Sequence, residues 1–137
     1  ETDPSGHFVL SSQVYTTPRD LARFGLLYLR DGVWEGERVL PPGWVDFSRR
    51  VAPASRRLAP SHRAHRGYGA QLWLVGRDPR LPDDAYSTGG ARGQYATLVP
   101  SRDVVVVRMG LDPLRGSGWD QRGFVAEILA ALGSRTD

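Results

Sequence analysis

The sequence predicts an α+β fold in which an antiparallel sheet is flanked by helices. Apolar residues recur at helical spacing near both ends of the chain, after Thr17 and in residues 117–132. Between them, three stretches rich in β-branched and aromatic residues predict strands at 68–75, 95–99 and 104–107. Grouped strands with helices at either end are typical of an antiparallel sheet covered by helices.

Composition narrows the function classes. The chain has 137 residues, enough for one ordinary domain, and it has no cysteine, which excludes disulfides and cysteine-based metal sites. It has no apolar run of the length that a membrane helix needs, so we expect no membrane span. All 18 basic residues are arginine, and most are scattered among acidic residues. This even distribution argues against a nucleic-acid partner despite the net charge of +3.

Local signals define the first two helices. Thr17-Pro18-Arg19-Asp20 combines an N-cap residue, a proline at the first helical position and an acid in the first turn. Asp31-Gly32 predicts the end of that helix. Residues 33–40 suggest a miniature hairpin, and Pro41-Pro42-Gly43 predicts the start of a second short helix.

Residues 52–67 show no periodicity and are rich in Pro, Ser, Ala and Arg, which predicts a mobile surface loop. His62 and His65 lie in it three residues apart, so a metal pair is conceivable. Without a third ligand nearby, solvated loop histidines are the better interpretation. We therefore expect two regions: a helical part over 1–67 that includes this loop, and the strands with a closing helix over 68–137.

The most informative stretch is 87–110. A glycine-rich turn at 89–94 feeds the strand 95–99, and a Pro/Asp turn at 100–103 leads into the valine run 104–107, which predicts an antiparallel hairpin. The continuous valine run predicts a strand that is buried on both faces and covered by helices. Glycines at the mouth of the hairpin would let a ligand approach the backbone closely. The segment is therefore both a predicted core and a candidate wall of an active site.

The chain by itself shows no activated nucleophile. No serine lies in a Gly-x-Ser-x-Gly elbow, and a Ser-x-x-Lys motif is excluded because there is no lysine. Asp20, Asp83 and Asp84 are best interpreted as solvated carboxylates. The 89–94 turn precedes a strand instead of a helix, so it does not fit a phosphate-binding loop.

Four stretches in this order resemble one family: 15–25, which reads YTTPRDLARFG; 42–45, PGWV; 68–73, YGAQLW; and the hairpin that contains GARGQY. Together they resemble the carboxy-terminal portion of the β-lactamase-related serine hydrolases, a group with class C β-lactamases, esterases and 6-aminohexanoate-dimer hydrolases. The resemblance covers nearly the whole chain and implies a β-lactamase/penicillin-binding-like fold.

The resemblance implies a serine hydrolase that cleaves an ester or amide through an acyl-enzyme, without a cofactor or metal. In this family the nucleophile lies in a Ser-x-x-Lys motif, which would fall upstream of the present chain. The amino-terminal part of the same protein is then the expected partner, supplying the nucleophile and the rest of the sheet, and this segment alone is expected to be inactive. A location in the bacterial cytoplasm or periplasm is expected.

The resemblance also implies the roles of individual residues. The backbone N–H of Ala91 is the first candidate for the oxyanion hole, and Gln94 is the alternative position. Many members carry Lys-Thr-Gly or His-x-Gly here, whereas this chain has Ala91-Arg92-Gly93, so Arg92 is the candidate cation facing the substrate. Gly90 and Gly93 are candidate substrate-binding positions. A non-catalytic binding or interaction domain with the same fold is the alternative function.

Overall fold

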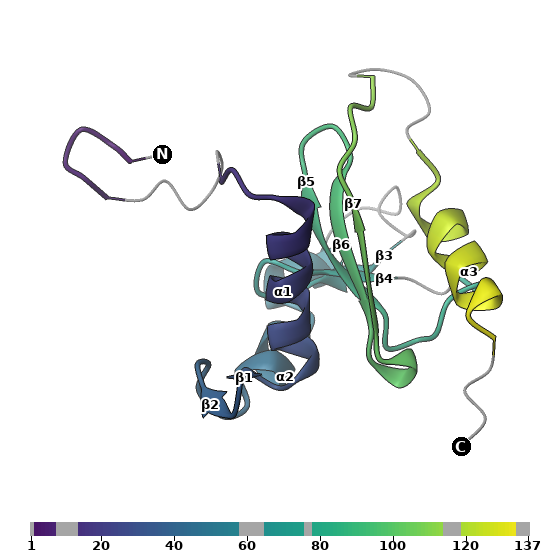
Figure 1. Cartoon of the computed structure of the whole chain (residues 1–137), viewed down its shortest axis with the longest axis horizontal. Helices are drawn as coiled ribbons and strands as arrows, with labels where there is room; N and C mark the ends of the chain where they lie inside the picture. Colours follow the sequence, from purple (N-terminus) through teal and green to yellow (C-terminus); the bar gives the residue numbers. More distant parts are fainter. Residues whose placement is uncertain (1, 8–13, 58–64, 76–77, 114–118, 134–137) are drawn as a thin grey trace.

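A five-stranded antiparallel sheet lies between helices α1 and α3 (Figure 1). The computed structural model describes residues 2–7, 14–57, 65–75, 78–113 and 119–133. The strands follow one another in sheet order and in sequence order: β3 (His65–Tyr68), β4 (Trp73–Val75), β5 (Tyr86–Gly90), β6 (Gln94–Val99) and β7 (Val104–Arg108). The described helices are α1 (Pro18–Leu29), α2 (Trp44–Ser48) and α3 (Gln121–Ala131).

The predicted α+β class is confirmed, and the sheet contains two strands more than the three expected. The stretch 68–75 is not one strand: β3 ends at Tyr68 and β4 begins at Trp73, with a turn between them that holds Gln71 at a φ of +63°. The second addition is β5, because Gly89 and Gly90 pair with β6 as strand residues instead of belonging to the turn. The turn itself is therefore only residues 91–93.

Short connections around the sheet follow the local signals. The expected miniature hairpin forms from β1 (Val33–Trp34) and β2 (Glu37–Arg38), and α2 starts just after Gly43. Within 52–67, which we expected to be a loop, Pro53–Arg57 forms a 3-10 helix and β3 begins at His65. Residues 58–64, and His62 with them, lie outside the described residues. The division of the chain at residue 67 stays a prediction.

Helix α1 covers one face of the sheet. Thr17 caps it as expected, since its Oγ1 accepts from the Asp20 N–H at 3.1 Å and its hydroxyl donates to Asp20 Oδ2 at 2.7 Å. Gly25 brings the helix against β7, because a Cβ there would lie 2.6 Å from Val105 Cγ1. The core on this face consists of Leu72, Leu74, Tyr86 and Leu98, with Tyr28, Leu29, Val51 and Val105 packed against it.

Helix α3 covers the opposite face. Asp120 caps it by accepting from the Gly123 N–H at 3.0 Å. Val125 and Leu129 of the helix are buried against the sheet, and the core on this face contains Val75, Leu81, Ala85, Val99, Val106, Val125 and Leu129. Two separate cores thus hold the two helices on the sheet.

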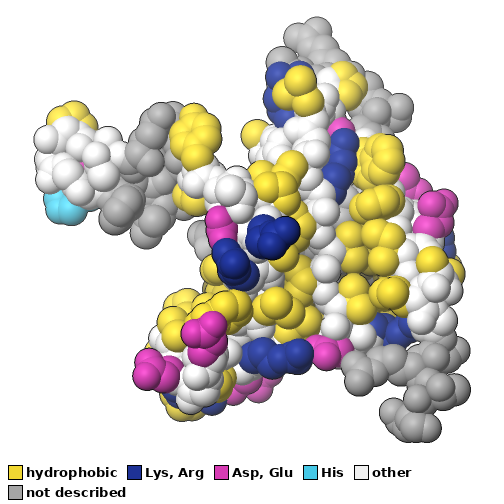
Figure 2. All heavy atoms as spheres, viewed as in Figure 1, with side chains coloured by type: hydrophobic (Ala, Val, Ile, Leu, Met, Phe, Trp, Pro, Cys, Tyr) yellow, Lys and Arg dark blue, Asp and Glu magenta, His cyan; other side chains and the backbone are white. Residues whose placement is uncertain are grey.

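Strand β7 is less buried than its valine run predicts. Of Val104, Val105, Val106 and Val107, only Val106 is buried, with 6% of its surface exposed. The reason is position: β7 is the last strand in the sheet order of the described residues, so the expectation of a strand buried on both faces was wrong in degree. Figure 2 shows apolar side chains gathered on both sides of the β7 backbone, toward α1 and toward α3.

Candidate functional site

The 91–93 turn links β5 to β6 and contains three of the five predicted site residues, and the other two, Gly90 and Gln94, flank it. Its backbone is tightly wound, with φ of +60° at Arg92 and +91° at Gly93. Ala91 and Arg92 are exposed, whereas Gly93 is buried. The turn is thus accessible at its tip and enclosed on the side that faces the rest of the protein.

The Arg92 side chain is bound to the segment that follows β7. Its Nε donates to the carbonyl oxygen of Asp112 at 3.0 Å, and the Asp112 N–H donates back to the Arg92 carbonyl at 2.9 Å. The side chain therefore packs along the segment that follows β7. Its predicted role as a cation facing the substrate stays a prediction.

Gln94 is held by its side chain at the start of β6. Its Oε1 accepts from the Gly110 N–H at 3.1 Å, and its Nε2 donates to the Gly110 carbonyl. Both ends of the amide are thus engaged by one backbone residue beyond β7. This arrangement explains why glutamine fits the position without any role in chemistry, and its predicted oxyanion role stays untested.

An ion pair that the sequence did not single out supports the enclosed side of the turn. Arg108 Nη2 lies 2.5 Å from Asp112 Oδ1, and Arg108 Nη1 donates to the Gly93 carbonyl at 2.9 Å. Arg108 beside the carboxylate lowers the pKa of Asp112 below its usual value. The only sequence signal for this pair was the spacing of four residues between Arg108 and Asp112. That spacing predicts an ion pair in a helix but not in the extended segment found here.

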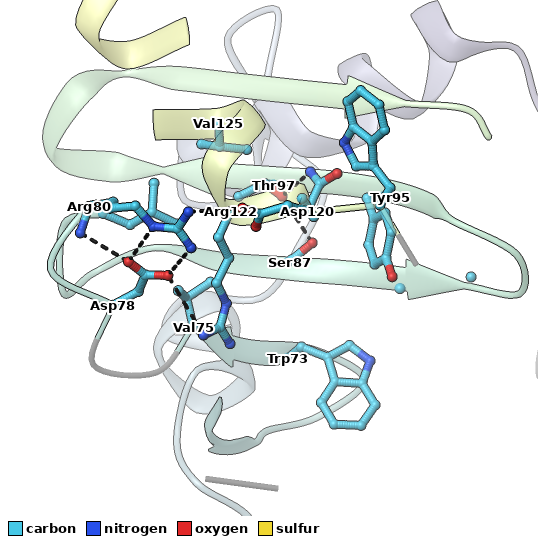
Figure 3. A pocket seen from close by; sticks show the side chains of 15 residues that line it. Trp73, Val75, Asp78, Arg80, Ser87, Tyr95, Thr97, Asp120, Arg122 and Val125 are labelled. Atoms are coloured by element: carbon cyan, nitrogen blue, oxygen red, sulfur yellow. Dashed lines mark hydrogen bonds and ion pairs between the residues drawn. The ribbon is translucent and has the colours of Figure 1, made fainter. Parts of the chain in front are cut away.

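A cavity of about 670 Å³ opens on the α3 face of the sheet next to this turn (Figure 3). Of the predicted site residues, Gly90 lines it, whereas Ala91, Arg92, Gly93 and Gln94 do not. Trp73 and Tyr95 stand at one end of the cavity, and Asp78 and Arg80 stand at the other (Figure 3). Gly89 lies against the aromatic end of the cavity, where a Cβ would lie 2.9 Å from the Trp73 ring.

Hydroxyl groups and an amide form the polar part of the cavity wall. Ser87 Oγ lies 3.2 Å from Thr97 Oγ1, and Gln121 Nε2 of α3 donates to Thr97 Oγ1 at 3.0 Å. Thr97 is 2% exposed, so this network joins β5, β6 and α3 inside the protein. Ser87 has no His or Tyr among these partners, which makes it a structural hydroxyl and not an activated nucleophile.

The charged end of the cavity is a network around Arg80. Its guanidinium lies 2.8 Å from Asp78 Oδ2 and 2.9 Å from Asp120 Oδ2, and Arg122 lies 4.0 Å from Asp78 Oδ2. The hydrogen bonds from Arg80 lower the pKa of Asp78 to about 2. The network anchors the N-terminus of α3 to the segment between β4 and β5.

The described residues contain no group of three or more His, Cys, Asp and Glu side chains that could hold a metal ion. Of the two histidines considered for a metal pair, His62 lies outside the described residues and His65 is described only as part of β3. No helix within the described ranges is long and apolar enough to cross a membrane.

The fold is shared with parts of two solved structures. The chain matches part of two solved β-lactamase-like structures: a putative 6-aminohexanoate-dimer hydrolase from Bacillus anthracis (TM-score 0.60, 21% identity, 95% of this chain and 31% of that one) and a putative β-lactamase from Bacteroides dorei (TM-score 0.55, 18% identity, 96% of this chain and 44% of that one). These likenesses show an α+β fold that corresponds to part of a β-lactamase-like structure.

A curated relative makes the relationship more specific. The chain is 32% identical over 116 residues to the 6-aminohexanoate-dimer hydrolase of Paenarthrobacter ureafaciens, a match that covers 81% of this chain and 28% of that protein. No family model matches the sequence. The resemblance found in the sequence is thus confirmed as a partial match to a 6-aminohexanoate-dimer hydrolase and to β-lactamase-like structures.

Proposed function

We propose that this chain is a segment of a serine hydrolase that cleaves an ester or amide bond through an acyl-enzyme. The observation that supports this most is the 32% identity over 116 residues to a 6-aminohexanoate-dimer hydrolase, together with the shared fold. Because the chain spans only 28% of that relative, the activity belongs to a longer protein of which this chain is a part.

In the proposed reaction a serine outside this chain attacks the substrate carbonyl carbon. A neighbouring base takes the serine proton, the carbonyl oxygen becomes an oxyanion, and collapse of the tetrahedral intermediate expels the alcohol or amine after it gains a proton. Water then attacks the acyl-enzyme in the same way and releases the acid. No serine of this chain is assigned the nucleophilic role.

The 91–93 turn supplies one oxyanion donor in this proposal. Ala91 is exposed, so its N–H can meet a ligand, and a small side chain leaves the amide open. Among the described residues, the contacts that hold the turn use the carbonyls of Arg92 and Gly93, and none of them uses the amide of Ala91. Gly90, which lines the neighbouring cavity, lets the substrate approach the backbone, and Arg92 provides positive charge at the rim.

The partner in this proposal is the remainder of the longer protein. Adjacent strands lie about 4.8 Å apart and a helix is about 10 Å wide, so α1 or α3 alone covers roughly half of a face of five strands. Exposed aromatic side chains fit the same view, because Phe24, Trp44, Phe47 and Trp119 are each at least 40% exposed. Further elements would cover this surface and bring the serine to the turn.

The alternative is a non-catalytic binding domain that keeps the fold. The observation that favours it is the absence of lysine from the whole sequence, which excludes a Ser-x-x-Lys motif in this chain. Reading the gene upstream of the codon for Glu1 separates the two: the hydrolase proposal requires a Ser-x-x-Lys motif in that frame, and a frame without one supports the binding domain.

The direct test is hydrolysis of a p-nitrophenyl ester by the full-length protein and by two variants of Ala91. Ala91→Pro removes the N–H, and we expect turnover to fall by about 10²–10³-fold, as for other oxyanion donors. Ala91→Gly keeps the N–H and serves as the control. Equal rates for the proline variant and the unmodified protein would remove Ala91 from the oxyanion hole. Loss in Gln94→Pro alone would move the donor to Gln94.

A further inference from the structure

We propose that Arg108 and Asp112 are positioning residues, which fix the 91–93 turn and thereby aim the Ala91 amide at the oxyanion. This inference rests on the proposed function for its catalytic consequence. Its structural part, that the pair determines the order of the turn, stands on contacts of this chain alone.

The pair binds two carbonyls of the turn. Arg108 Nη1 donates to the Gly93 carbonyl at 2.9 Å, and the Asp112 N–H donates to the Arg92 carbonyl at 2.9 Å. A third bond runs the other way, from Arg92 Nε to the Asp112 carbonyl at 3.0 Å. Two consecutive peptide units of the turn are therefore bound to Arg108 and Asp112, which together form its support.

The support is itself rigid. Arg108 Nη2 lies 2.5 Å from Asp112 Oδ1, and the two side chains are only 17% and 14% exposed, so water screens the pair weakly. The Arg108 guanidinium also lies over the Trp119 ring, 5.0 Å from its centroid. Charge, hydrogen bonds and an aromatic surface together restrict the guanidinium to one position.

Two glycines make room for that guanidinium. A Cβ at Gly93 or at Gly110 would overlap Arg108 Nη1, so a side chain at either position would expel the arginine. Gln94 closes the same end of the hairpin through its two bonds to Gly110. Gly93 and Gly110 thus leave the space that the Arg108 guanidinium occupies, and the tip of the turn at Ala91 is exposed.

The expected catalytic effect is selective. A donor that stabilises the oxyanion acts in the transition state, so loosening it lowers kcat and leaves KM nearly unchanged. Misplacement of a reacting group by about 1 Å can cost up to about a hundredfold in rate. We therefore expect a loss of about ten- to a hundredfold in kcat for Arg108→Met.

The experiment has a structural and a catalytic arm. In the 137-residue chain, amide hydrogen exchange by NMR is compared for the unmodified protein, Arg108→Met and Asp112→Asn, which keeps the shape of the side chain. We expect faster exchange at Asp112, whose amide donates to the Arg92 carbonyl, and unchanged exchange at Leu98 near the end of β6. The matched control is Arg30→Met, which breaks the Arg30–Asp103 pair (2.6 Å) at the opposite end of β7. This control should leave the turn unchanged.

In the full-length protein the same variants are assayed for ester hydrolysis, together with Arg108→Lys, which keeps the charge and can restore one hydrogen bond. We expect kcat to fall in Arg108→Met, to recover in part in Arg108→Lys, and to stay unchanged in Arg30→Met. Unchanged exchange at the Asp112 amide overturns the structural part of the proposal. A loosened turn with unchanged kcat overturns only its positioning role. An unmodified full-length protein that hydrolyses no ester or amide overturns the proposed function and the catalytic role with it, whereas the exchange data still decide the structural part.

Discussion

Gly69 lies directly against the carbonyl oxygen of Ser48, so close that a Cβ at this glycine would overlap the oxygen. The Ala70 N–H donates to the same oxygen at 3.0 Å. The contact joins the end of α2 to the turn between β3 and β4. It thereby connects the helical segment on the α1 side to the outer strands of the sheet.

Gly69→Ala is expected to destabilise the protein by about 3 kcal/mol, the upper part of the range for overpacking, because a backbone oxygen cannot rotate away as a side chain can. Urea unfolding followed by circular dichroism measures the loss. Gly36→Ala is the reference, since its surroundings are open and only its φ of +88° causes strain. That strain costs about 1–2 kcal/mol. A Gly69 variant no less stable than the Gly36 variant would contradict the close contact.

Thr17→Ala should lower the free energy of unfolding by about 1 kcal/mol, because it removes the side-chain acceptor for the Asp20 N–H at the start of α1. The urea midpoint of the variant is the measurement. Thr16→Ala, one residue earlier and outside the cap, is the matched control and should have no effect beyond about 0.5 kcal/mol. Equal midpoints for the two variants would show that Thr17 does not cap the helix.

Thr97→Val should cost about 1–3 kcal/mol, since it leaves the Gln121 Nε2 group and the Ser87 hydroxyl without a common partner inside the protein. Thr97→Ser keeps the hydroxyl, and we expect it to lose less than the valine variant although it removes a methyl group. Thermal unfolding of both variants tests this. A Thr97→Val variant more stable than Thr97→Ser would mean that the hydroxyl network contributes nothing to stability.

The Asp78–Arg80 pair predicts a stability change at acid pH. The pKa of Asp78 is lowered from 3.8 to about 2 in the folded protein, so the folded state favours the ionised carboxylate. This contribution is complete above pH 3.8 and is lost as the pH falls from 3.8 toward 2.

NMR titration of the Asp78 carboxyl carbon tests the pH prediction. We expect a midpoint near 2 in the unmodified protein and a higher midpoint in Arg80→Gln, where the strongest hydrogen-bonding partner is removed. Asp78→Asn should flatten the decline of stability between pH 4 and 2. A midpoint that Arg80→Gln leaves unchanged would show that Arg80 does not set the pKa.

The sequence predicted those parts of the fold that depend on neighbouring residues. The start of α1 follows from Thr17, Pro18 and Asp20, and the β6–β7 hairpin follows from two apolar runs around a Pro/Asp turn. The break between β3 and β4 could not be predicted in this way, because Gly69 is needed for a contact with Ser48, a residue distant in the chain.

In the candidate site, too, the sequence indicated the residues that lie in one local segment and missed those that only the fold brings together. The glycine-rich composition drew attention to Ala91 and its neighbours, whose roles stay predictions. The support behind them was missed, because Arg108 and Asp112 are recognisable only once β7 lies beside β6 and Gly93 faces the guanidinium. The cavity on the α3 face was missed for a similar reason: Trp73, Tyr95 and Gln121 come from three separate elements.

Strand β6 carries one further consequence. Its consecutive residues Leu98 and Val99 are both almost completely buried, and they belong to the cores beneath α1 and α3 respectively. Neither core can open without disturbing the strand on which the other is built. We therefore expect the two cores to unfold as one cooperative unit, so that the most protected amides of α1 and of α3 exchange with the same free energy of opening.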